Sequence, residues 1–163
     1  MRTLREVPHL ARRFVDAFRR SEPSEADTLW AAGIAGPAAA LWEAQSVQDR
    51  RHTIAVARAV EGSDPPRWVL EAALLHDVGK AEAALGPLGR SLATVLEILG
   101  VGSAPGALGR YLTYPRRGAE LLAAVGSDPL VVRWAAEHHE DPERWTVPRA
   151  WAERLVAADR TAR

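Results

Sequence analysis

Apolar residues recur along this chain at the three- and four-residue spacing that is typical of amphipathic α-helices. In one such run, Leu70, Ala73 and Leu74 share a helix face. Asp77 falls in register with them, so a carboxylate is expected at the end of a buried stripe. β-branched residues are few, Ala and Leu dominate, and no stretch alternates with a period of two. The pattern therefore predicts an all-α fold.

Proline and glycine positions set the expected helix boundaries. The stretch from Gly33 to Pro37 should kink the second helix. Asp64 is suited to cap a helix that starts at Pro65, and Asp128 repeats this start signal before the next proline. The expected helices cover residues 7–20, 25–45, 46–60, 65–77, 89–99, 115–125, 129–140 and 148–161.

Two more polar side chains fall on or beside apolar helix stripes. His52 shares the spacing of Val56, Ala59 and Val60, and Asp159 follows the stripe of Trp151, Leu155 and Ala158. Taken singly, each has an ordinary structural explanation. A backbone carbonyl would satisfy the buried imidazole, and an exposed ion pair with Arg160 would satisfy the carboxylate.

The length and composition of the chain bear on its number of domains, its partners and its location. With 163 residues, 47% of them hydrophobic and 26% charged, the chain should form a single domain over residues 1–163. Its 21 acidic and 21 basic residues balance, so we do not expect nucleic acid or an anionic membrane as partner. The longest uncharged run, from Thr28 to Trp42, is short and interrupted, and no secretory signal begins the chain. We expect a soluble cytoplasmic protein.

The pair His76–Asp77 is the strongest chemical signal. A carboxylate on a buried stripe at the negative end of a helix is unfavourable unless a positive charge faces it. One divalent Mn, Fe, Co, Ni or Zn ion, held by both side chains, would supply that charge; the alternative is a solvated turn. Because the chain has no cysteine, His and carboxylate are its strong ligands. Lys80 is the one lysine among 21 basic residues and is suited to a phosphate or a bound water.

Paired histidines stand at the end of another expected helix. His138 and His139 are candidate ligands or proton donors, or they complement the negative end of the helix dipole.

Together with His52, the pair His76–Asp77 and Asp159, these two histidines form a pattern. This pattern resembles the HD superfamily of metal-dependent phosphohydrolases, over roughly Gln48 to Asp159, in the segments H-D-V-G-K, E-H-H-E and A-A-D-R. The resemblance implies an HD-domain helical bundle, with residues 1–45 outside the motif.

The resemblance also implies roles for these residues. The metal ligands would be His52, His76, Asp77 and Asp159, and the metal would lower the pKa of a water that attacks phosphorus. By the same resemblance Asp77 orients that water or takes its proton, and Lys80 neutralises the phosphoryl oxygens. Either His138 or His139 protonates the leaving oxygen or contacts the phosphate, and the sequence does not choose between them.

Tyr114 departs from the pattern of the family. Relatives with two metals have a histidine there, and a phenol is a poorer ligand for most divalent ions. We therefore expect one metal, and a phosphomonoesterase acting on a nucleotide or a similar small phosphate ester instead of a cyclic-dinucleotide phosphodiesterase. The alternative is a degenerate domain that keeps the metal for structure or ligand binding. Nucleic-acid binding through the arginine-rich first helix ranks below both.

Overall fold

The computed structural model describes residues 22–83 and 113–162, and all regular structure in these two ranges is helical. The prediction of an all-α fold is confirmed for this part of the chain, whereas the helices expected at 7–20 and 89–99 lie outside it. The elements, in chain order, are α2 (Glu25–Ala35), η2 (Gly36–Ala38), α3 (Ala39–Glu43), α4 (Val47–Glu61), α5 (Arg67–Leu75), α6 (Lys80–Ala83), α9 (Tyr114–Ala124), α10 (Pro129–Glu137), η3 (Pro142–Arg144) and α11 (Arg149–Thr161). None of the described helices is long and apolar enough to cross a bilayer.

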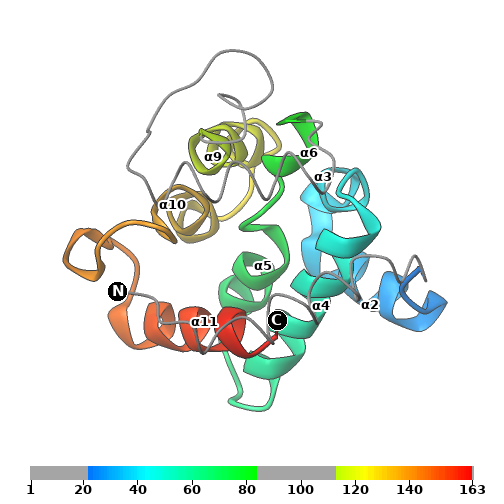
Figure 1. Cartoon of the computed structure of the whole chain (residues 1–163), viewed down its shortest axis with the longest axis horizontal. Helices are drawn as coiled ribbons and strands as arrows, with labels where there is room; N and C mark the ends of the chain where they lie inside the picture. Colours follow the sequence, from blue (N-terminus) through cyan, green and yellow to red (C-terminus); the bar gives the residue numbers. More distant parts are fainter. Residues whose placement is uncertain (1–21, 84–112, 163) are drawn as a thin grey trace, which may run out of the picture.

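Helix α5 is the centre of the bundle, with α4, α10 and α11 around it (Figure 1). Val69 and the run from Ala72 to Leu75 are fully buried, so almost the whole circumference of its second half faces other helices. Alanine at two of these positions lets the neighbouring backbones approach closely. A helix that is apolar on nearly every side is stable only inside a bundle, which explains why this segment occupies the core.

The kink expected between Gly33 and Pro37 is confirmed. Gly36, at φ +54°, begins the 3-10 turn η2, and the proline after it is the second residue of this turn, which redirects the chain into α3. The turn brings Trp42 into the core, where it is fully buried and its indole Nε1 donates a 3.1 Å hydrogen bond to Thr53 of α4. This bond joins the N-terminal helices to the helix that carries His52.

The buried face of α4 is rotated relative to the predicted stripe. Ala59 is exposed, so the predicted stripe is wrong at Ala59. The buried residues of α4 are Asp49, Thr53, Ile54, Val56, Ala57 and Val60. His52 lies at the edge of the buried face and is 21% exposed. An edge position leaves the backbone of α4 in the core while the imidazole reaches the end of α5.

The predicted start of α5 is also wrong. Asp64 does not cap it but sits in the preceding turn at φ +50°, and Pro66 takes the N-cap position instead. The reason is the second proline: a residue that precedes proline is disfavoured in the helical region, so Pro65 cannot begin a helix. At its other end α5 stops at Leu75, and residues 76–79 form a tight turn before α6, so the helix ends slightly earlier than expected.

The C-terminal helices largely follow the predicted boundaries. Gly126, at φ +76°, separates α9 from α10, and the carboxylate of Asp128 accepts a 2.7 Å hydrogen bond from the amide of Leu130, as a helix cap does. Leu155 and Ala158 of α11 are buried against the bundle, and Trp151 is only partly buried. Because α11 packs on α4, its last turn lies beside His52.

Candidate metal centre

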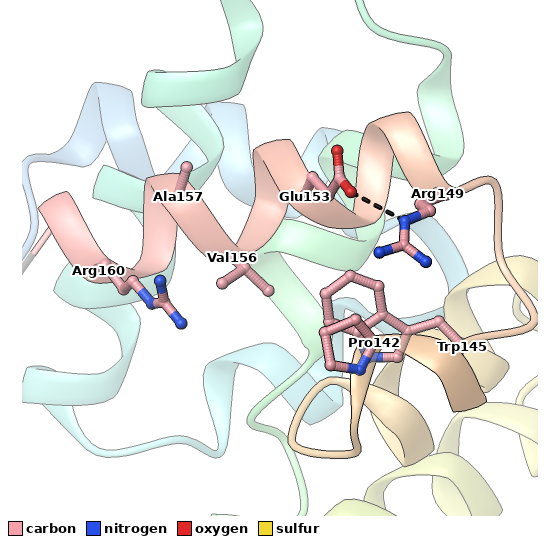
Figure 2. A pocket seen from close by; sticks show the side chains of 7 residues that line it. All are labelled: Pro142, Trp145, Arg149, Glu153, Val156, Ala157 and Arg160. Carbon is pink, nitrogen blue, oxygen red and sulfur yellow. Dashed lines mark hydrogen bonds and ion pairs between the residues drawn. The ribbon is translucent and has the colours of Figure 1, made fainter. Parts of the chain in front are cut away.

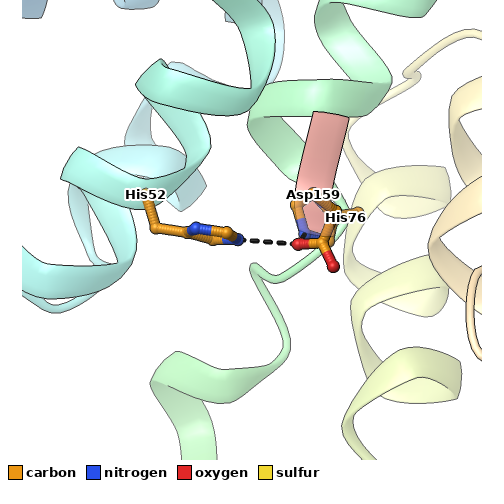
Figure 3. Close-up of side chains that lie close together, drawn as sticks. All are labelled: His52, His76 and Asp159. Atoms are coloured by element: carbon orange, nitrogen blue, oxygen red, sulfur yellow. Dashed lines mark hydrogen bonds and ion pairs between the residues drawn. The ribbon is translucent and has the colours of Figure 1, made fainter. Parts of the chain in front are cut away.

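Three side chains from three helices converge beside the end of α5 (Figure 3). His52 comes from α4, His76 caps α5, and Asp159 comes from the last turn of α11. One ligand atom of each lies within 4.8 Å of the other two. Nε2 of His52 is 2.8 Å from Oδ1 of Asp159, and Nε2 of His76 is 3.8 Å from the same oxygen. These three residues could together hold a metal ion.

Asp77 lies directly beside this group. Its Oδ2 atom is 3.6 Å from Nε2 of His76 and accepts a 2.5 Å hydrogen bond from the ammonium of Lys80. Its Oδ1 atom is buried without a hydrogen-bond partner among the described residues and faces Nε2 of His138 at 3.8 Å. The carboxylate therefore stands between the group of His52, His76 and Asp159 and the histidine of α10.

The orientation of His76 is fixed by its own helix. Nδ1 lies 3.0 Å from the carbonyl oxygen of Ala73 and donates to it, so Nε2 is directed at the two carboxylates. In the neutral tautomer the lone pair of Nε2 would face Asp77 and Asp159, which is unfavourable unless a cation lies between them. Among the described residues, two carboxylates and one imidazole lone pair therefore lie close together, which is the polarity that a cation requires.

The separations also suit one ion. Donors about 2.1 Å from a common metal at ordinary coordination angles lie about 3.0–3.4 Å apart. The contacts of His76 with Asp77 and Asp159, at 3.6 and 3.8 Å, are a few tenths of an ångström longer than that. Small side-chain rotations would therefore bring the donors of His52, His76 and Asp159 onto one ion, and Asp77 lies outside this group of three, beside His76.

The electrostatics of Asp77 favour an ionised ligand. Burial opposes ionisation, but the neighbouring positive charges, of which the Lys80 ammonium has the largest effect, outweigh it and hold the pKa of the Asp77 carboxyl well below its usual value. A buried carboxylate that remains ionised at neutral pH is the form in which an acid ligates a divalent metal.

His138 and His139 take different positions, although they are neighbours in sequence. The side chain of His138 is buried, its ring centroid is 5.1 Å from that of His76, and its Nδ1 donates to the carbonyl oxygen of Ala135 at 3.0 Å. Burial, followed by the nearby His139 and His76, lowers the pKa of His138 well below its ordinary value. His138 is therefore neutral at pH 7, with Nε2 as a hydrogen-bond acceptor.

Tyr114 contacts both histidines. Its hydroxyl lies 3.2 Å from Nε2 of His138 and 2.5 Å from Nε2 of His139. His139 is exposed, whereas the side chain of His138 is buried, and the centroids of the two imidazole rings lie 4.1 Å apart. Sequence reasoning treated Tyr114 only as a missing ligand and did not foresee this bridge.

The structure thus brings together His52, His76 and Asp159, and it places Asp77 with its partner Lys80 beside them. His138 also lies near Asp77, whereas His139 is exposed. The backbone carbonyls that orient the imidazoles were also missed by sequence reasoning. Both carbonyls lie three residues before their histidine, so the position of each histidine at a helix end was the available signal.

A separate cavity lies on the exposed side of α11, between that helix and η3 (Figure 2). It has a volume of about 280 Å³ and is lined by Pro142, Trp145, Arg149, Glu153, Val156, Ala157 and Arg160. None of the candidate ligands is among these residues. Arg149 is held there by Glu153 at 2.9 Å, so much of the charge in this cavity is paired. The candidate chemistry lies elsewhere, at the end of α5.

No family model, curated protein or solved structure matches the chain. Membership of the HD superfamily therefore stays a prediction, and it rests on the motif residues and on the way the fold gathers them.

Proposed function

We propose that this chain is a metal-dependent phosphohydrolase of the HD type, which hydrolyses a nucleotide or another small phosphate ester. The observation that carries the proposal is the convergence of His52, His76 and Asp159 from three separate helices, with Asp77 alongside. A divalent metal bound there would lower the pKa of a water and so supply hydroxide at neutral pH.

The metal would be held by His52, His76, Asp77 and Asp159. Two imidazoles and two carboxylates suit Mn, Fe, Co, Ni or Zn, and the two negative charges balance one divalent ion. The Ala73 carbonyl, through Nδ1 of His76, fixes the ligating nitrogen in the way that second-sphere hydrogen bonds do in metalloproteins.

Lys80 and Asp77 would handle the charge and the proton of the reaction. Lys80 is a compact cation, 17% exposed, at the edge of the site, where it can stabilise the negative charge that develops on phosphoryl oxygens. Asp77 is ionised and can orient the attacking water or accept its proton.

The two histidines that follow α10 would differ in role. His138 is neutral and uses its Nδ1 proton for the Ala135 carbonyl, so it can accept a hydrogen bond from a water or a substrate hydroxyl but is a poor acid. Delivery of a proton to the leaving oxygen is therefore assigned to His139, which is exposed.

Tyr114 supports a centre with one metal and also favours a second candidate function. Its hydroxyl contacts the Nε2 atoms of both histidines, the atoms that would otherwise be free to ligate a second ion. A domain whose second site is filled in this way could retain its metal for structure or ligand binding and have no turnover.

The test is elemental analysis of the purified protein, followed by a phosphatase screen over a nucleotide panel. We expect one metal per chain, activity that chelation removes and Mn or Co restores, and loss of activity in Asp159→Asn. Glu153→Gln, on the exposed side of the same helix, is the matched control and should behave as wild type. Stoichiometric metal without turnover on any substrate would support the non-catalytic domain, and a protein that binds no metal would refute both.

A further inference from the structure

Two different groups approach the same oxygen atom of Asp77. Oδ2 accepts the hydrogen bond of Lys80, and the same atom is the one that approaches Nε2 of His76. We propose that Lys80 and the metal compete for this oxygen, so that metal binding releases the Lys80 ammonium and makes it available to an anionic substrate. This inference rests on the metal centre of the proposed function.

Geometry and charge make the competition direct. A metal ligated by Oδ2 would lie about 2.0–2.2 Å from it. An ammonium 2.5 Å from the same oxygen would then stand next to a divalent cation in a site where Asp77 is almost fully buried and screening is weak. Repulsion between the two cations therefore favours one of them at a time.

The other oxygen of Asp77 does not remove the conflict. Oδ1 is buried 3.8 Å from Nε2 of His138, whereas Oδ2 is the oxygen that lies 3.6 Å from Nε2 of His76. Exchange of the two oxygens by rotation would place the oxygen that carries Lys80 against the neutral imidazole of His138. The ammonium would then have to follow Oδ2 to a new position or lose this hydrogen bond, so the Lys80 side chain would move in either case.

The structure offers a route for the released side chain. Nζ of Lys80 lies 4.8 Å from the centre of the Tyr114 ring, on whose face a cation is stabilised. Moving along this ring brings the ammonium to the side of the site where Tyr114 contacts His138 and His139. Metal loading would thus generate a phosphate-binding cation, and the substrate would bind after the metal.

The chain allows a direct test, because Lys80 is its only lysine. Protein labelled with ¹⁵N at the lysine side chain gives one ammonium signal, which can be followed by NMR during titration with Zn²⁺. We expect this signal to shift, and its protons to exchange faster with water, until one equivalent is bound. His76→Ala should show no such change at the same Zn²⁺ concentration.

An unchanged lysine signal, while one Zn²⁺ per chain binds, would overturn the inference and leave the metal centre intact. Absence of Zn²⁺ binding would overturn it together with the centre. Neither outcome depends on turnover. A failure of the lysine inference can therefore be told apart from a failure of the proposed hydrolase activity.

Affinity provides a second measurement. Lys80→Met should bind Zn²⁺ more tightly by a factor of about 10, within the usual range for coupled sites, and Lys80→Arg should stay close to wild type. Arg116→Met, which removes a highly exposed cation from α9, controls for net charge. Equal or weaker binding by Lys80→Met would contradict the competition. If that variant does not fold without metal, the NMR titration of the wild type decides.

Discussion

Among the glycines that the structure describes, Gly79 is the one where an added methyl group meets the closest atoms. It follows Val78 in the turn between α5 and α6. A Cβ atom at residue 79 would lie 2.0 Å from the carbonyl oxygen of Tyr114 and 2.8 Å from the amide nitrogen of Gly118. Both are backbone atoms of α9, so no side-chain rotation relieves the clash.

The size of the effect follows from these distances. Ordinary contact begins at 3.4 Å, so α9 and the turn would have to separate by about 1.4 Å (3.4 minus 2.0) in Gly79→Ala. Overpacking of a tight core costs about 1–3 kcal/mol, and a clash with fixed backbone belongs at the upper end of that range. For a chain of this length, about 3 kcal/mol lowers Tm by about 6–12 °C.

Thermal unfolding followed by circular dichroism would measure this loss, with two other glycines as controls. Gly33→Ala meets no atom within 4 Å and should stabilise α2 by up to about 1 kcal/mol. In Gly118→Ala the nearest atom is at 3.2 Å, so the gain in helix propensity and the tight contact should nearly cancel. A Gly79→Ala protein that unfolds within 1 °C of wild type would show that α9 does not pack on this turn as described.

Three further outcomes are expected. Zn²⁺ at about 100 times its Kd should stabilise the protein by about 2.7 kcal/mol, and His52→Ala should abolish this gain. Tyr114→His should raise the bound metal measured by elemental analysis from one to two per chain, whereas Tyr114→Phe should leave it at one. In chelator-treated protein, the lowered pKa of His138 means that the unfolded chain binds a proton that the folded chain does not. The free energy of unfolding, measured with urea, should therefore fall as pH drops below about 6.5, and less so in His138→Asn.

The sequence predicted the helices well where local signals agree. Asp128 and the proline after it cap and start α10 as expected, because both residues act within one turn. Asp64 failed as a cap because the second proline, Pro66, changed the backbone before it. Ala59 failed because an alanine is tolerated on either face of a helix, so its apolar character does not locate the buried side.

The candidate site was predictable only in part. Periodicity placed His52, Asp77 and Asp159 on or near buried stripes, but only the family resemblance suggested that they meet. The bridge that Tyr114 makes between two histidines depends on how α9 lies against α10, which no local pattern determines. Tertiary packing therefore supplies the information that the sequence reading lacked.

The contact between His52 and Asp159 spans 107 positions of the chain. A metal held by both would act as a cross-link that closes a very long loop, and it would fasten α11 to α4. Local opening of α11 would then require release of the ion. The amide hydrogens of the last helix should exchange with deuterium far more slowly when the metal is present. The exchange rate of α11 would therefore show whether the metal is bound.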